Sequence, residues 1–209
     1  MFFGNIISFL IGSINGSVLL ASICKLSDIR NHGSKNPGTT NAIRTHGLIF
    51  GLTVLLFDSS KSYASILLNT YMNTSSTPNS WEALLYVILG HCFSPFLYGQ
   101  GGKGVAALFG GIFAIDATLG VFLLAIWGIG FIITKCSALG AASTLIGLIS
   151  WNIYYAHSID LWLIIAIILL RHSSNWQELI YAFDKISTEN TEPSCRGSNS
   201  IRSCEKGSI

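Results

Sequence analysis

Seven apolar segments, separated by short polar connections, limit the folds open to this chain of 209 residues. A membrane-spanning helix needs about 20 consecutive apolar residues, and most of the seven approach that length. Only 11% of the residues are charged, whereas soluble domains carry about 25%. The sequence therefore predicts an all-α integral membrane protein with about seven transmembrane helices. The segments are residues 2–23, 48–68, 81–98, 105–115, 117–134, 137–155 and 159–170, of which the fourth and seventh are short for a full crossing.

The basic residues test this number, because cytoplasmic connections carry an excess of Lys and Arg. Eleven of the twelve fall in the first, third and fifth connections or after the seventh segment, and only Lys61 lies inside a segment. This separation predicts an odd number of crossings, with the N-terminus outside and the C-terminus in the cytoplasm. The eleven are Lys25, Arg30, Lys35, Arg44, Lys103, Lys135, Arg171, Lys185, Arg196, Arg202 and Lys206.

Composition also divides the chain. Residues 1–184 are expected to form one multi-pass membrane domain, and the serine-rich residues 185–209 a disordered cytoplasmic tail. The N-terminus lacks the basic region and cleavage site of a secretory signal, so the first segment is expected to be retained. A net charge of +2 is too small to suggest nucleic acid as a partner. The five cysteines lack the CxxC or histidine spacing of a metal site, so no metal is expected.

The first connection contains a polar stretch, GSKNPGTTNAIR, at residues 33–44. It combines uncharged hydrogen-bond donors with Arg44, whose planar guanidinium suits a phosphate or carboxylate. The alternative interpretation is a solvated interfacial loop with Asx-type turns. The uncharged residues are Ser34, Asn36, Thr39, Thr40 and Asn41.

The third connection contains GQGGKGVA at residues 99–106. Glycines at 101, 102 and 104 would let backbone N–H groups approach an anion, Lys103 adds a charge, and a helix start follows. The spacing is not that of a Walker A loop. A flexible turn is the alternative.

A third polar stretch, RHSSNW at 171–176, follows the last apolar segment. Taken alone, Arg171 could be a snorkelling membrane anchor, His172 a surface histidine and His91 a satisfied interface histidine. All three stretches fall on the predicted cytoplasmic face, however, and all are rich in groups that bind phosphate. The sequence therefore predicts that they form one shared anionic site.

Asp58 and Lys61 interrupt the second apolar segment and share a helix face at a spacing of i, i+3. Ionisable groups in membrane helices are usually paired or functional. Two interpretations remain open: a pair that fixes helix packing, or a direct contact with substrate.

The three stretches, in this order, resemble the signature regions of the bacterial acyl-phosphate-dependent glycerol-3-phosphate acyltransferases, the PlsY family. The resemblance runs over residues 5–184 and includes IGSINGSVLLASI, DIRNHGS and CSALGA. It implies a seven-helix enzyme of the bacterial inner membrane with its active site on the cytoplasmic face. The implied reaction transfers a fatty acyl group from acyl phosphate to the sn-1 hydroxyl of glycerol 3-phosphate, giving lysophosphatidic acid and phosphate. Membrane lipid is a further expected partner, and no cofactor is implied.

The resemblance also assigns residues. It implies that Ser34, Arg44 and Lys103 hold substrate phosphate, and that Ser137, His172 and Asn175 position the glycerol moiety. The loop of Gly101, Gly102, Lys103 and Gly104 would serve the acyl phosphate. The expected catalytic residues are His172, Lys103 and Arg44, and further expected substrate-binding residues are Asn36, Gly38, Thr40 and Asn41. Lys35 is not expected to take part.

An acyl phosphate has a good leaving group, so the protein mainly has to orient the hydroxyl and stabilise the developing charge. No acyl-enzyme is required. His172 is a candidate general base, and proton transfer to a substrate phosphate is equally compatible. None of the five histidines has an aspartate five positions later, so the HxxxxD pattern of acyl-thioester-using acyltransferases is missing.

The chain departs from the family pattern at several positions, which are Ser94, Gly99, Gln100, Ala107, Ala138, Glu178, Ala182 and Asp184. Ser94 stands where the family usually has proline. A membrane transporter of an organic phosphate is the alternative function. Transporters tend to show internal repeats and polar groups at the bilayer midplane, and no repeat is evident in this sequence.

Overall fold

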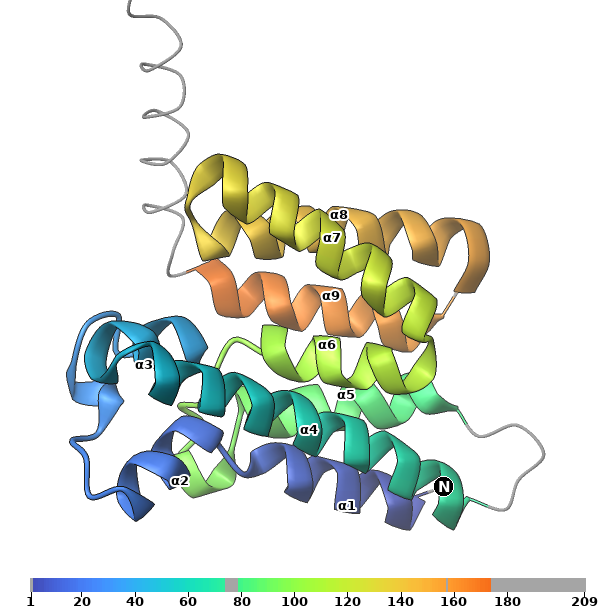
Figure 1. Ribbon diagram of the computed structural model, residues 1–209. Helices are drawn as coiled ribbons and strands as arrows, with labels where there is room; N and C mark the ends of the chain where they lie inside the picture. Colours follow the sequence, from blue (N-terminus) through green and yellow to red (C-terminus); the bar gives the residue numbers. More distant parts are fainter. Residues whose placement is uncertain (1, 74–78, 157, 174–209) are drawn as a thin grey trace, which may run out of the picture.

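The computed structural model describes residues 2–73, 79–156 and 158–173, and every regular element in these ranges is helical (Figure 1). The predicted all-α class is confirmed, whereas the predicted tail lies outside the described residues. The α-helices are α1 (Phe2–Ser13), α2 (Gly16–Ile23), α3 (Thr39–His46), α4 (Leu48–Met72), α5 (Ser80–Cys92), α6 (Val105–Ile115), α7 (Ala117–Thr134), α8 (Ser137–Trp151) and α9 (Ile159–His172). Two 3₁₀ turns, η1 (Ile29–Asn31) and η2 (Pro95–Leu97), and a π-helical turn, η3 (Asn152–Ala156), complete the set.

Each of the seven predicted apolar segments corresponds to one α-helix, except that the first corresponds to two. The axes of α1 and α2 differ by 52°. Asn15 explains the break, because its side-chain oxygen accepts a hydrogen bond from Val18 N at 3.1 Å and so caps the start of α2. The first segment is therefore bent within the bundle.

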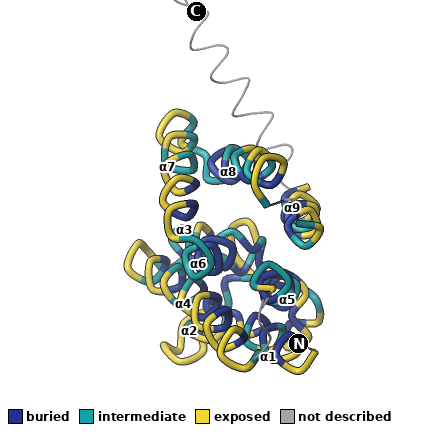
Figure 2. The backbone as a smooth tube through the Cα atoms, turned by 90° about the vertical axis from the view of Figure 1, so that its right-hand side faces the viewer, coloured by how far each residue is buried: buried dark blue, intermediate teal, exposed yellow. Residues whose placement is uncertain are grey.

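By length and apolar composition, α7 qualifies as a membrane span among the described residues, and the bent pair of α1 and α2 qualifies as a second. Most of the other helices, such as the 11-residue α6, are shorter than the roughly 20 residues of an upright crossing, whereas α4 has 25 residues. The surface is nevertheless that of a protein in lipid. Large apolar side chains such as Ile49, Tyr71 and Ile133 are 84%, 86% and 66% exposed, and exposed residues line the outer faces of the helices (Figure 2).

Polar side chains, in turn, lie inside the bundle. Asn5 of α1 donates a hydrogen bond to Glu82 of α5 at 2.8 Å, and Asn69 of α4 donates to Asn5 at 3.1 Å and to Ser8 at 3.2 Å. In lipid, the hydrophobic effect does not drive helices together, so hydrogen bonds between helices help to stabilise the bundle. This network joins α1, α4 and α5.

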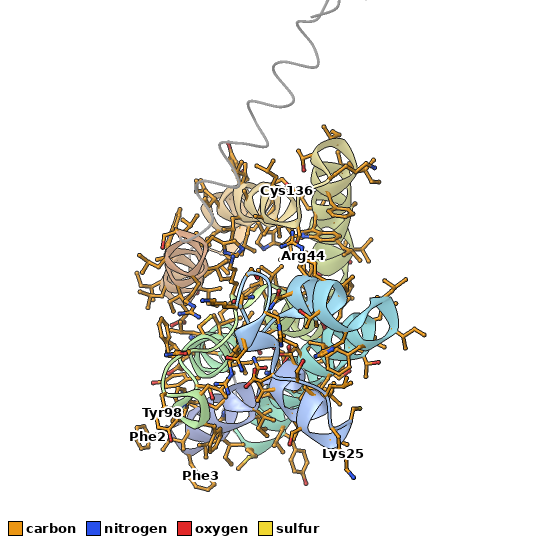
Figure 3. All side chains as sticks on the ribbon, turned by 90° about the vertical axis from the view of Figure 1, so that its left-hand side faces the viewer. Phe2, Phe3, Lys25, Arg44, Tyr98 and Cys136 are labelled. Carbon is orange, nitrogen blue, oxygen red and sulfur yellow. The ribbon has the colours of Figure 1, made fainter. Side chains whose placement is uncertain are left out.

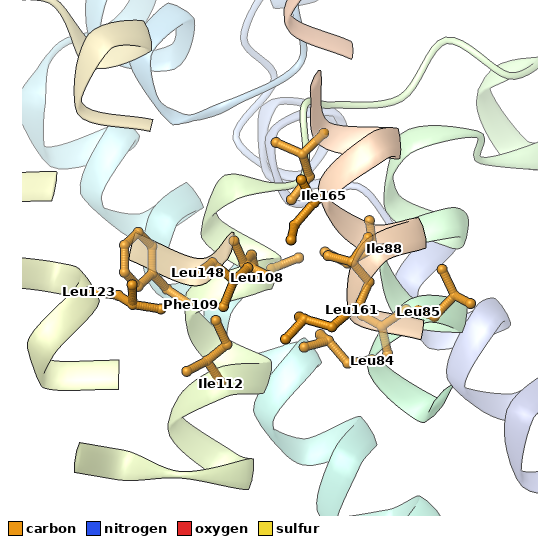
Figure 4. Close-up of a cluster of buried hydrophobic side chains, with 14 of the residues drawn as sticks. Leu84, Leu85, Ile88, Leu108, Phe109, Ile112, Leu123, Leu148, Leu161 and Ile165 are labelled. Carbon is orange, nitrogen blue, oxygen red and sulfur yellow. The ribbon is translucent and has the colours of Figure 1, made fainter. Parts of the chain in front are cut away.

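Close backbone approach supplies the rest of the packing of α1 on α5. A Cβ atom at Gly12 would lie 2.3 Å from the carbonyl oxygen of Val87, and one at Gly90 would lie 2.1 Å from that of Phe9. Small residues permit this approach in membrane helices. A larger apolar core, which includes Leu84, Ile88, Leu108, Ile112, Leu123, Leu148, Leu161 and Ile165, joins α5 and α6 to α7, α8 and α9 (Figure 4).

The connections that contain the polar stretches all lie at one end of the bundle. Figure 1 shows the α2–α3 connection, the α5–α6 connection and the end of α9 at the left of the view. The polar stretch 33–44 is only partly a loop, because α3 begins at Thr39 within it.

Candidate active site

A pocket of about 290 Å³ opens at this end of the bundle. Its walls come from three segments far apart in the sequence, which confirms the prediction that the three polar stretches meet. The lining residues are Ser34, Lys35, Asn36, Pro37, Gln100, Gly101, Lys103, Leu170, Arg171 and Ser173. Three of them are cationic side chains, so the pocket suits an anion.

Residues 34–37 form the first wall of the pocket, and Asn41 holds this wall in place. Its side-chain oxygen accepts from Ser34 N at 3.1 Å, while its amide group donates to Ile29 O at 2.9 Å and His32 O at 3.0 Å. The residue is only 1% exposed. The side chain of Asn41 therefore fixes the loop that presents Ser34, and its substrate contact stays a prediction.

The rest of the first wall follows the prediction more closely. Ser34 and Asn36 line the pocket, and Gly38 lies just behind them as the N-cap residue of α3. Gly38 N donates to Asn36 O at 2.9 Å. Lys35, which the sequence analysis set aside, also lines the pocket; its backbone is in the left-handed region, with φ of 58°.

Residues 100–104 form the second, glycine-rich wall, which is held by backbone hydrogen bonds to the end of α5. Gly101 N donates to Cys92 O at 3.2 Å and Gly102 N donates to His91 O at 3.1 Å. The expectation that these two amides face an anion is therefore wrong. Glycine is required for space instead, because a Cβ at Gly101 would lie 2.0 Å from His91 O.

Gly104, the third glycine of this wall, has a different task. Its φ of 86° turns the chain into α6 as the N-cap residue. Lys103, immediately before it, lines the pocket. The charge of Lys103 and the start of α6 are therefore adjacent, as the sequence predicted.

Arg171 belongs to the third wall, at the end of α9, and its side chain binds the backbone of the glycine-rich wall as a clamp. Its guanidinium donates from Nε to Gly102 O at 3.1 Å and from Nη2 to Gly101 O, and it lies 5.6 Å from the ring centroid of Phe93. Arg171 belongs to the third polar stretch of the predicted anionic site, but it was not itself among the expected substrate-binding residues. Its position directly before His172 was the available signal that it belongs to the site.

His172 is the last residue of α9 and is 8% exposed. Its Nδ1 lies 2.8 Å from Ile168 O. Because a carbonyl oxygen can only accept, Nδ1 carries the proton and Nε2 of the neutral ring is the acceptor. The ring is thus arranged as a base at Nε2, although it is not among the residues that line the pocket.

Three further predicted residues belong to α3 and α8. Thr40 on α3 donates a hydrogen bond to Ser137 at the start of α8, at 3.1 Å. Arg44 lies one turn further along α3 and is exposed; Figure 3 labels it on the side of α3 toward Cys136. None of the three is in the pocket lining. Asn175 lies outside the described residues.

The sequence model of a family described as glycerol-3-phosphate acyltransferase matches residues 2–182. The chain belongs to this family. It is 34% identical over 181 residues to the glycerol-3-phosphate acyltransferase of Blochmanniella floridana, covering 83% of this chain and 89% of that protein. It is 36% identical over 180 residues to that of Francisella tularensis subsp. holarctica, covering 84% and 87%.

Two solved structures of the integral membrane acyltransferase PlsY have the same fold as this family member. The glycerol 3-phosphate form gives a TM-score of 0.76 at 28% identity, covering 86% of this chain and 92% of that one. The lysophosphatidic acid form gives 0.72 at 27% identity, covering 86% and 91%. Membership of an acyltransferase family disfavours the organic-phosphate transporter.

Proposed function

We propose that this glycerol-3-phosphate acyltransferase uses acyl phosphate as its donor and acylates the sn-1 hydroxyl of glycerol 3-phosphate. The observation that carries the proposal is the convergence of Lys35, Lys103 and Arg171 from three segments on one pocket. Both substrates carry a phosphate, so a site with several cationic side chains meets the main electrostatic need of the reaction. The ligands named for the two solved PlsY structures, glycerol 3-phosphate and lysophosphatidic acid, match one substrate and the product.

The chemistry follows from these groups. Lys103 and Ser34 hold phosphate in the pocket, and Arg44 of α3 supplies a second guanidinium. The hydroxyl oxygen attacks the acyl carbon, its proton passes to His172 Nε2 or to a substrate phosphate, and inorganic phosphate departs. Ser137 and Thr40, bonded to one another, and Asn175 orient the glycerol moiety. The protein contributes orientation and charge stabilisation, and no covalent intermediate on the protein is needed.

We further infer seven membrane crossings, with the N-terminus outside and the pocket facing the cytoplasm of a bacterial inner membrane. The described basic residues outside α4 belong to α3, to the α2–α3, α5–α6 and α7–α8 connections or to the end of α9, which lie at the pocket end of the bundle (Figure 1). Glu82, Asp116 and Asp160 belong to the starts of α5, α7 and α9, which lie at the opposite end. This distribution matches the excess of Lys and Arg in cytoplasmic connections. The acyl chain of the donor then lies in lipid while its phosphate reaches the pocket.

The test is turnover by the purified protein in detergent. Palmitoyl phosphate plus glycerol 3-phosphate should release inorganic phosphate and give 1-acyl lysophosphatidic acid, whereas palmitoyl coenzyme A should give no product. Mass spectrometry of the product, with the sn-2 acyl isomer as a standard, checks the position of the acyl group. Product from the thioester and none from acyl phosphate would overturn the proposed donor.

A further inference from the structure

The break between α1 and α2 is contacted by the first wall of the pocket and by the turn that leads into the second wall. Asn15 of the break donates from Nδ2 to Pro37 O, in the first wall, at 3.0 Å. Ser94, which precedes the glycine-rich wall, donates to Ser13 O at 2.6 Å. Ser13, Asn15 and Ser94 are 0%, 5% and 0% exposed. The break is therefore a fixed point to which two separate pocket walls are attached.

The break leaves a backbone N–H and a backbone carbonyl without partners in the helix, and the buried pair Asp58 and Lys61 of α4 forms hydrogen bonds with them. Gly16 N donates to Asp58 Oδ1 at 3.2 Å, and Lys61 Nζ donates to Ile14 O. Lys61 Nζ also lies 2.7 Å from Asp58 Oδ1. The side chain of Asp58 is 1% exposed and that of Lys61 is 6% exposed. The pairing that the sequence allowed is confirmed, and it is anchored on the break.

Lys61 extends this cluster to the glycine-rich wall. Its Nζ lies 3.1 Å from His91 Nδ1, which therefore accepts a hydrogen bond from the ammonium group. His91 Nε2 lies only 2.3 Å from the point that a Cβ of Gly102 would occupy. The carbonyl of His91 accepts from Gly102 N. His91 thus contacts the wall through both its ring and its backbone.

The three N–H groups of the Lys61 ammonium are matched by three acceptors, on Asp58, Ile14 and His91. No donor is left for a substrate. This counts against the direct substrate contact that the sequence left open. Helix packing alone does not account for the arrangement either. The contacts through Asp58 and Ile14 reach the α1–α2 break, and the contact with His91 reaches the glycine-rich wall of the pocket.

We infer that Asp58 and Lys61 are positioning residues, which set the relative placement of the first and glycine-rich walls through the α1–α2 break and His91. The inference rests on the proposal that the pocket binds the substrates. A displacement of about 1 Å in a positioned group can lower turnover by as much as 100-fold. Loss of the Lys61 contacts is therefore expected to act on substrate affinity and turnover without removing any group that touches substrate.

The experiment compares K61M with N69A, purified in the same detergent. Asn69 is a matched control because it is also buried in α4, and its side-chain hydrogen bonds within the described residues go to Asn5, Ser8 and Asn73, none of which lines the pocket. The readouts are the melting temperature, the monodisperse fraction, and kcat and KM for glycerol 3-phosphate per folded molecule. K61M should raise KM at least about fivefold and lower kcat at least about tenfold. N69A should lower the melting temperature but leave KM and kcat within about twofold.

The D58N/K61M double variant keeps the test decisive if K61M does not fold, because removing both partners leaves no unpaired buried charge. The amide oxygen introduced by D58N can still accept from Gly16 N. The double variant should fold and remain impaired in KM and kcat. Wild-type KM and kcat in whichever of these variants folds, or equal kinetic losses in N69A, would overturn the inference. An inactive wild-type protein would instead overturn the proposed function.

Discussion

Arg171 illustrates how much a single side chain can decide in this pocket. Its guanidinium reaches the carbonyl oxygens of two consecutive residues, Gly101 and Gly102, while the same residue lines the pocket. A fork of planar donors suits two neighbouring acceptors, and the compact ammonium of lysine does not reproduce it. Charge alone is therefore not the property that matters at this position.

Replacing Arg171 with lysine should keep the charge and lose the clamp. We expect kcat/KM to fall by about 10- to 100-fold, which corresponds to about 1.4–2.7 kcal/mol of lost transition-state stabilisation. Phosphate release from acyl phosphate measures the effect. The matched control is R30K, because Arg30 pairs with Asp28 at 2.6 Å outside the pocket lining. Equal kcat/KM for R171K and R30K would contradict the role of the clamp.

At the scale of elements, apolar length and polar interruptions were enough to locate the apolar helices and the three pocket walls, but not α3, which lies within a polar stretch. The break at Asn15 was not foreseen, because one amide side chain hardly changes the hydropathy of a 22-residue segment, although Asn followed by Gly is a turn signal. The hydrogen-bond partners of the polar groups in the pocket walls could not be predicted from the sequence either. Asn41 and the amides of Gly101 and Gly102 look like free donors in the sequence, and only tertiary contacts reveal that they are occupied.

The contact of α1 with α5 gives a prediction at this scale. In G90A, the added methyl group would lie 2.1 Å from Phe9 O, a backbone atom that can move only with its helix. We expect a loss of about 1–3 kcal/mol in the free energy of unfolding, which is typical of overpacking. Thermal unfolding in one detergent compares it with G128A, since nothing lies within 4 Å of a Cβ at Gly128. An unchanged melting temperature in G90A would contradict the close packing of these helices.

Considered as a whole, the molecule has two chemically different ends and an apolar flank. The pocket end carries cationic residues such as Lys35 and Lys103, the opposite end carries Glu82 and Asp116, and exposed apolar side chains cover the faces between them. This polarity gives the protein a direction in a bilayer. The direction decides from which compartment the pocket is reached.

Cysteine labelling tests the direction. Cys24 is exposed and follows α2 at the pocket end, whereas Thr118 is exposed at the opposite end, in the first turn of α7. In intact spheroplasts, a membrane-impermeant maleimide should label T118C in a background without other cysteines. Single Cys24 should be labelled only after the membrane is permeabilised. The reverse pattern would place the pocket on the outer face.

The bond from Gly101 N to Cys92 O uses no side-chain atom of either residue. Substitutions at residue 92 that still fit the buried core therefore leave this attachment in place, whereas any side chain at residue 101 would collide with the His91 carbonyl. In evolutionary terms, the two partners of one contact are under unequal constraint. A lineage can exchange the cysteine and still inherit the position of the pocket wall, provided that the glycine persists.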